Sequence, residues 1–222
     1  MSETLDPRRE PRLVRQEGLN LDIPNSMFIV GVGGVGMWVA YLAAMMGVKN
    51  LTLCDPDVVE LSNENRLPLT KLINVRGEPI LKVNAAAELC LMYTRSVFPI
   101  ASRVSTIFLD AFRVATNPNF RTVVVCCTDN IESQRFTTQY CMGHGVEYFR
   151  AGCGASGVTV TTAGPPEWGD TTPGYGEPSW VIPPVIAASL CLAEIVKKSI
   201  SLSVEKSVGL VSRREVANVQ TS

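Results

Sequence analysis

A glycine-rich turn near the start of the chain constrains the fold more than any other feature. Residues 27–32, MFIVGV, are apolar and rich in branched side chains, which predicts a buried strand. Residues 34–47 predict a helix that ends at Gly47, and residues 50–55, NLTLCD, predict a second strand. The first strand and the helix are joined by the glycines of a G-x-G-x-x-G pattern, Gly31, Gly33 and Gly36. The chain therefore opens with one βαβ unit, whose crossover is right-handed in nearly all proteins.

The rest of the chain continues the alternation of strands and helices. Helices are expected over residues 82–93, 133–145 and 183–200. Strands are expected over residues 103–108 and 121–129, once or twice between 147 and 164, and at 207–212 as a closing strand. This alternation predicts an α/β fold with a doubly wound, mostly parallel sheet.

The domain organisation follows from the distribution of polar and loop-forming residues. Residues 1–26 are polar and contain three prolines, which predicts an N-terminal arm with a short helix. Residues 27–222 are expected to form a single nucleotide-binding domain with a Gly/Pro loop near residues 164–182.

The composition excludes several classes of function. Lys and Arg total 20 and Asp and Glu total 21, so the overall charge provides no attraction for nucleic acid. The longest uncharged apolar runs, residues 35–48 and 181–193, are shorter than a membrane span of roughly 20 residues. The seven cysteines include no CxxC pair, so neither a disulfide framework nor a zinc site is expected. We therefore expect a cytoplasmic protein with no nucleic-acid or membrane partner.

The glycine turn predicts a nucleotide but leaves its identity open. The first glycine makes the turn, the second lets the backbone approach a phosphate, and the third lets the helix pack on the strand. The phosphate then meets the free N–H groups at the helix N-terminus. Asp55 follows at a distance of about 20 residues, where an acid accepts ribose hydroxyl groups. NAD-dependent dehydrogenases and ATP-using enzymes share this pattern.

The residues after the second strand favour a triphosphate. Asn63 and Arg66 lie in the run DPDVVELSNENR, and Lys82 begins the next expected helix. Such groups stabilise the charge that develops on the phosphates during nucleophilic attack, whereas hydride transfer needs no cluster of this kind. Asp129 ends an expected strand, where ligand-facing residues of open α/β sheets lie, and its carboxylate suits Mg²⁺. Taken alone, Arg66 and Lys82 are also compatible with surface charges.

Several motifs in order resemble one enzyme family. The turn GVGGVG, the run DPDVVELSNENR, a lysine in an Ala-rich helix and VVVCCTDN with Arg135 beyond it resemble the ThiF/MoeB/HesA family of ubiquitin-activating-enzyme-like adenylyltransferases. The segment RLVRQ resembles the arm motif of that family, and the resemblance covers about residues 12–200. It implies a Rossmann-like fold that binds ATP and Mg²⁺. It also implies an enzyme that attaches AMP to a carboxylate, usually the C-terminal glycine of a ubiquitin-like or sulfur-carrier protein, with release of pyrophosphate.

The resemblance also implies a role for each matching residue. Asp55 would hold the ribose, and Asp129 would bind Mg²⁺. Arg15 would reach into the site of a partner subunit, because the family is commonly homodimeric. The nucleotide would lie against the turn formed by Gly31, Gly33, Gly34 and Gly36. The phosphates and their developing charge would be held by Asn63, Arg66 and Lys82.

The chain also departs from the family pattern. Many relatives carry two CxxC pairs that bind zinc, and this sequence has none. Several relatives use a cysteine in the crossover loop, whereas residues 164–182 contain no cysteine and Cys153 is the nearest alternative thiol. We therefore expect adenylation with no zinc and with the acceptor chemistry supplied elsewhere. The alternatives are an NAD-dependent oxidoreductase and a non-catalytic nucleotide-binding partner subunit, and the retained Arg66, Lys82 and Asp129 argue against the latter.

Overall fold

A six-stranded sheet forms the middle layer of the protein. The computed structural model describes residues 11–68, 77–116, 119–162 and 179–197. The strands are β1 (Ser26–Val30), β2 (Asn50–Cys54), β3 (Ser96–Ile100), β4 (Thr122–Cys126), β5 (Glu147–Cys153) and β6 (Val158–Thr161). Their order is β3-β2-β1-β4-β5-β6, and only β6 runs antiparallel to its neighbour. The order reverses at β1, and open α/β sheets bind ligands at such a switch point.

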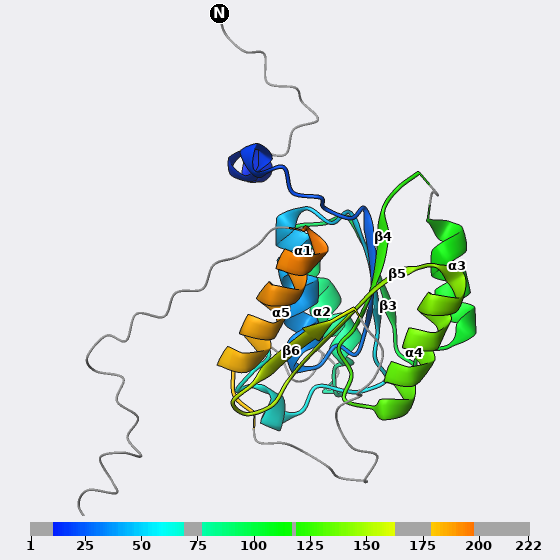
Figure 1. Ribbon diagram of the computed structural model, residues 1–222. Coiled ribbons are helices and arrows are strands. Elements are labelled where there is room, and N and C mark those ends of the chain that lie inside the picture. Colours follow the sequence, from blue (N-terminus) through cyan, green and yellow to red (C-terminus); the bar gives the residue numbers. More distant parts are fainter. Residues whose placement is uncertain (1–10, 69–76, 117–118, 163–178, 198–222) are drawn as a thin grey trace, which may run out of the picture.

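Helices cover both faces of the sheet (Figure 1). One face carries α1 (Gly34–Met46), α2 (Lys82–Cys90) and α5 (Ile182–Ile195), and the other carries α3 (Thr106–Ala115) and α4 (Ile131–His144). Two 3₁₀ turns complete the described elements, η1 (Pro11–Leu19) and η2 (Leu61–Asn63). The doubly wound, mostly parallel α/β fold expected from the sequence is confirmed, and it is Rossmann-like.

Two cores result from the side-chain alternation of buried strands. Met27 and Ile29 of β1 pack against α1, α2 and α5, while Phe28 and Val30 pack against α3 and α4. All four side chains are almost fully buried because helices cover both faces, which explains why β1 is a continuous apolar run. The helix expected to end at Gly47 does so, because this glycine adopts φ 110° and caps α1 with its backbone N–H.

The strand expected over residues 103–108 is wrong. The strand is Ser96–Ile100, and α3 begins at Thr106. Two features account for the difference. Leu109 and Phe112 are three residues apart and bury one helix face on the sheet, where Phe112 packs edge-on against Phe28. The strand itself was missed because it contains Pro99, which β3 tolerates as an edge strand that pairs only with β2.

The described part of the N-terminal arm, η1, packs against the C-terminal end of α1. The guanidinium of Arg12 donates to the carbonyls of Ala44, Met45 and Tyr93, and the side-chain amide of Gln16 donates to the carbonyl of Met46. The bonds to Met45 and Met46 satisfy carbonyls in the last turn of α1, and the bond to Tyr93 ties the same arginine to the segment after α2. The expected crossover loop lies mostly outside the described residues, and the expected closing strand at 207–212 lies entirely outside them, so both stay predictions. No helix in the described ranges is both long and apolar enough to cross a membrane.

Candidate functional site

A cavity of about 700 Å³ opens at the carboxyl ends of the parallel strands. Its wall is formed by residues that follow β1, β2, β3, β4 and β5, and it is closed by Arg66, Lys82 and Pro184. Its size suits a small-molecule ligand, since such pockets measure roughly 300–1,000 Å³. The cavity lies at the point where the strand order reverses, as expected for an α/β binding site.

The glycine turn forms the wall of the cavity next to β1. Gly31 has φ +82°, and a Cβ there would lie 2.7 Å from the backbone nitrogen of Thr128. At Gly36 a Cβ would lie 1.8 Å from the carbonyl oxygen of Gly31, so the helix and the turn approach each other closely. Gly33 is the N-cap of α1 and provides no side-chain cap, which leaves the first N–H groups of the helix available to an anion. Gly36 therefore serves packing, whereas Gly33 and Gly34 line the cavity.

Asp55 is a buried carboxylate that lies directly after β2. Its two oxygens accept the backbone N–H groups of Val32, at 2.6 Å, and Asp57, at 2.9 Å. Burial raises the pKa of Asp55, and the two N–H donors oppose that rise by favouring the charged form. Each carboxylate oxygen retains a lone pair for a further donor, so the group can accept ribose hydroxyls while it holds the glycine turn.

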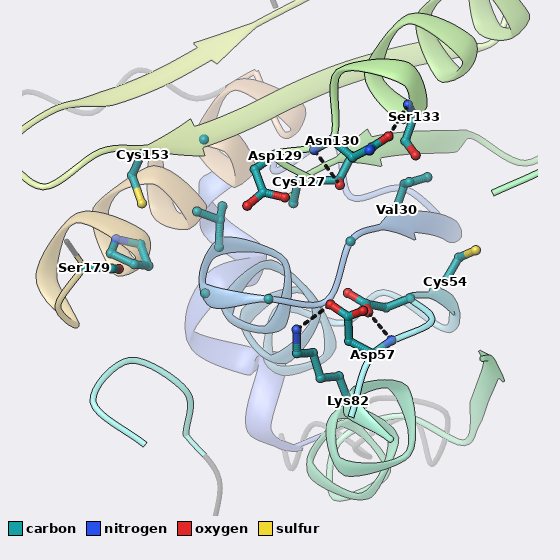
Figure 2. A pocket seen from close by; sticks show the side chains of 18 of the residues that line it. Val30, Cys54, Asp57, Lys82, Cys127, Asp129, Asn130, Ser133, Cys153 and Ser179 are labelled. Atoms are coloured by element: carbon teal, nitrogen blue, oxygen red, sulfur yellow. Dashed lines mark hydrogen bonds and ion pairs between the residues drawn. The ribbon is translucent and has the colours of Figure 1, made fainter. Parts of the chain in front are cut away.

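Lys82 lies at the cavity wall in an ion pair that was not expected from the sequence. Its Nζ lies 2.8 Å from Oδ2 of Asp57, and the Lys82 side chain is only 14% exposed (Figure 2). The Asp57 side chain is 59% exposed. It nevertheless holds Lys82 across a separation of 25 residues, which sequence spacing does not reveal.

Arg66 lines the cavity next to Gly34 of the glycine turn. Its Nη1 donates to the carbonyl of Ser62 at 2.7 Å and to Oδ1 of Asn65 at 3.0 Å. Its Cδ would lie 3.4 Å from a Cβ placed on Gly34, so the Arg66 side chain packs next to this part of the turn. The Trp38 indole donates to the backbone carbonyl of Arg66 at 2.9 Å. Trp38 therefore positions this segment as well as packing against the core.

Asn63 does not line the cavity. It is 5% exposed, and its Oδ1 accepts the backbone N–H of Glu60 at 3.2 Å, which closes the turn η2. Its Nδ2 donates to Ser62 at 3.3 Å. Asn63 therefore belongs to the turn that precedes Arg66 and supports that segment without lining the cavity.

Asp129 extends into the cavity from the end of β4 (Figure 2). Its side chain is exposed, and no donor or cation among the described residues contacts it. The backbone around it is held by Gln134, which donates to the Thr128 carbonyl at 2.9 Å, and by Asn130, whose Oδ1 caps α4 through the N–H of Ser133. A single carboxylate of this kind could serve as one ligand of Mg²⁺, an ion that takes its other ligands from phosphates and water. In the described ranges, no three His, Cys, Asp or Glu side chains gather as metal ligands.

Two other residues singled out from the sequence lie in different places. Cys153 lines the cavity together with Cys127, and burial raises the pKa of Cys127. Arg15 is exposed on η1, which contacts the C-terminal end of α1, whereas the cavity lies at the N-terminal end of that helix. Arg15 is thus remote from the cavity of its own chain. Its expected place in a partner's site concerns a second subunit and stays a prediction.

The fold and the site together define a nucleotide-binding α/β protein. A glycine turn opens a helix, a buried acid follows the neighbouring strand, and Arg66, Lys82 and the carboxylate of Asp129 line one cavity. The ThiF family model matches residues 13–197, and the chain belongs to this family.

Relatives of known name match part of the chain. Ubiquitin-like modifier-activating enzyme 5 of Culex quinquefasciatus is 32% identical over 144 residues, which are 60% of this chain and 35% of that protein. Adenylyltransferase and sulfurtransferase MOCS3 of Xenopus laevis is 29% identical over 125 residues, which are 53% of this chain and 25% of that protein. The chain thus spans about a third or less of the length of these curated relatives.

Solved structures share the fold. E. coli MccB, solved with ATP, has a TM-score of 0.63 at 20% identity, and the match covers 85% of this chain and 63% of that one. The structure of PaaA has a TM-score of 0.63 at 19% identity and covers 91% of this chain and 70% of that one. At this level of identity the likeness extends to the fold alone.

Proposed function

We propose that this protein is an ATP-dependent adenylyltransferase that activates a carboxylate. The observation that carries the proposal is the convergence of Arg66, Lys82 and Asp129 on one cavity beside an uncapped helix N-terminus. This set provides two cations for phosphates and a free carboxylate for Mg²⁺. Membership of the ThiF family and the name of the relative MOCS3 support the same reaction.

The reaction uses positioning and charge stabilisation. A carboxylate is ionised at neutral pH, so its oxygen attacks the α-phosphorus without a general base. A new bond forms between this oxygen and the phosphorus, and the bond to the bridging oxygen of pyrophosphate breaks. Pyrophosphate leaves with the electron pair of that bond. Lys82 and Arg66 stabilise the negative charge that develops, and the glycine turn and Asp55 hold the nucleotide in line.

The proposed acceptor is the C-terminal carboxylate of a small ubiquitin-like or sulfur-carrier protein. Relatives named as activating enzymes of ubiquitin-like modifiers support this choice, as does the fold shared with E. coli MccB, which has been solved together with MccA. A homodimer in which Arg15 contributes to the partner's site, and a cytoplasmic location, belong to the same proposal. An NAD-dependent oxidoreductase is less well supported, because hydride transfer gives Lys82 and Asp129 no role.

Ligand-induced stabilisation of the wild type and two matched variants tests this function. ATP with Mg²⁺ at 100 times its dissociation constant adds about 2.7 kcal/mol of stability, which raises Tm by roughly 5–10 °C for a chain of this size. Asp129→Asn should lose most of this response. Glu132→Gln, which makes the same change three residues further on an exposed turn of α4, should keep it.

The alternatives give different results in the same experiment. Stabilisation by NAD but not by ATP would refute adenylation. If ATP with Mg²⁺ stabilises Asp129→Asn as much as the wild type, Asp129 is not a ligand of Mg²⁺. Exchange of pyrophosphate into ATP, measured with a carrier protein that ends in Gly-Gly, then tests the acceptor class.

A further inference from the structure

Arg103 is a third cation at the cavity and differs from the other two in having no acceptor among the described residues. Lys82 is paired with Asp57, and Arg66 donates to the carbonyl of Ser62. The side chain of Arg103 is exposed at the wall, and no described residue accepts a hydrogen bond from it or forms an ion pair with it. The mechanism proposed above does not use it.

The backbone that carries Arg103 is nevertheless held firmly in place. The N–H of Ser102 donates to the carbonyl of Ile100 at 2.9 Å, and the buried Cys54 thiol donates to the carbonyl of Ser102 at 3.2 Å. On the other side, Val104 packs against the core beneath α3 and α4. A fixed backbone therefore carries a cationic side chain that is left free at the edge of the cavity.

The position of Arg103 follows from the order of the strands. Along the carboxyl edge of the sheet, the glycine turn follows β1, Asp55 follows β2 and Arg103 follows β3. Neighbouring strands lie about 4.8 Å apart. A nucleotide with its phosphates at the glycine turn and its ribose at Asp55 extends its base in the same direction, roughly one strand spacing further on. The base thus reaches the segment after β3.

We propose that Arg103 is a base-binding residue whose guanidinium lies over the face of the purine ring. This inference rests on the proposed function, since it assumes that a purine nucleoside triphosphate occupies the cavity. Arginine suits the role because its guanidinium is planar, weakly hydrated and always charged, and it stacks on aromatic faces. Arg103 then increases the affinity for the nucleoside but does not stabilise the negative charge that develops on the phosphates.

The test separates binding of the base from binding of the phosphates. Dissociation constants for ATP with Mg²⁺ and for inorganic tripolyphosphate with Mg²⁺ are measured by calorimetry for the wild type, Arg103→Ala and Arg95→Ala. Arg95 is the matched control, because it is also exposed and also flanks β3, but at the amino end of the strand and away from the cavity. Both variants remove one positive charge, and thermal unfolding verifies that each is folded.

The expected result is a selective loss. Arg103→Ala should weaken ATP binding on the order of 3- to 30-fold, from the usual strength of cation–π contacts, and should leave tripolyphosphate binding within about twofold. Arg95→Ala should change neither. Equal weakening of both ligands would make Arg103 a phosphate residue and overturn the inference, as would unchanged ATP binding. A wild type that binds no ATP would instead refute the proposed function itself.

Discussion

Gly33 and Gly36 stand three residues apart in the same turn, and replacing each with alanine should have opposite consequences. A Cβ on Gly36 would lie 1.8 Å from the carbonyl oxygen of Gly31 and 3.2 Å from the Cβ of Cys127. The first contact is to backbone, so no side-chain rotation relieves it. A Cβ on Gly33 meets nothing within 4 Å, and the φ of −82° at this position is ordinary for alanine.

The magnitudes follow from these distances. In Gly36→Ala, α1 or the turn must move by about 1 Å or more. Overpacking of this kind destabilises proteins by roughly 1–3 kcal/mol, and a clash with fixed backbone belongs at or above the upper end, which lowers Tm by roughly 6–12 °C. In Gly33→Ala, the loss of a favourable N-cap residue and the reduced freedom of the unfolded chain oppose each other, so stability should stay within about 1 kcal/mol.

ATP binding should be impaired in Gly33→Ala, the variant whose stability is nearly unchanged. Gly33 lines the cavity, so we expect the added methyl group of Gly33→Ala to occupy space that the phosphates need and ATP affinity to fall at least about tenfold, equivalent to 1.4 kcal/mol. Urea denaturation and calorimetry with ATP and Mg²⁺ on both variants provide the two readouts. The reasoning is refuted if Gly33→Ala unfolds as readily as Gly36→Ala, or if Gly36→Ala is as stable as the wild type.

Two further predictions concern the ion pair and the cysteines. Asp57→Asn removes a partner that is 59% exposed, so stability should fall by at most about 1 kcal/mol, while ATP should bind equally well or a few times more tightly because Lys82 is released and a negative charge is lost. Calorimetry checks this, and a tenfold loss of ATP affinity would instead make Asp57 a metal ligand. Burial raises the pKa of Cys54, Cys90 and Cys191 to about 12, so these thiols stay protonated near neutral pH and should react slowly with iodoacetamide, faster only as the pH rises. Cys153, partly exposed at the cavity, should be labelled first and should be protected by ATP, as mass spectrometry of timed samples can show, and early labelling of Cys191 would contradict the buried assignment.

Local signals in the sequence determined most of the fold. The apolar runs of β1, β2 and β4, the glycine turn and the helix stop at Gly47 are set by neighbouring residues, and all were predicted correctly. The segment from Ser96 to Ile100 was missed, because a proline argues against a strand unless the strand lies at an edge. Whether a strand lies at an edge depends on its neighbours in the sheet, which are far away in the sequence.

The cavity-lining residues that belong to recognisable sequence motifs could be predicted. Of the expected site residues, Gly31, Gly33, Gly34, Asp55, Arg66, Lys82 and Asp129 all line one cavity. They do so because residues that follow parallel strands meet at one edge of the sheet, and a regular strand–helix alternation already implies that edge.

The tertiary structure alone decided which side chains face the cavity and which support it. Asn63 belongs to the same motif as Arg66, yet its amide closes the turn η2. Asp57 pairs with Lys82 across 25 residues of sequence, and Arg103 lines the cavity just after a strand that was not predicted. The sequence by itself thus determined the doubly wound fold and most of the residues that gather at the switch point. The roles of the remaining residues depend on contacts between segments distant along the chain, because the direction of a side chain and its hydrogen-bond partner are fixed only when the strands and turns have packed together.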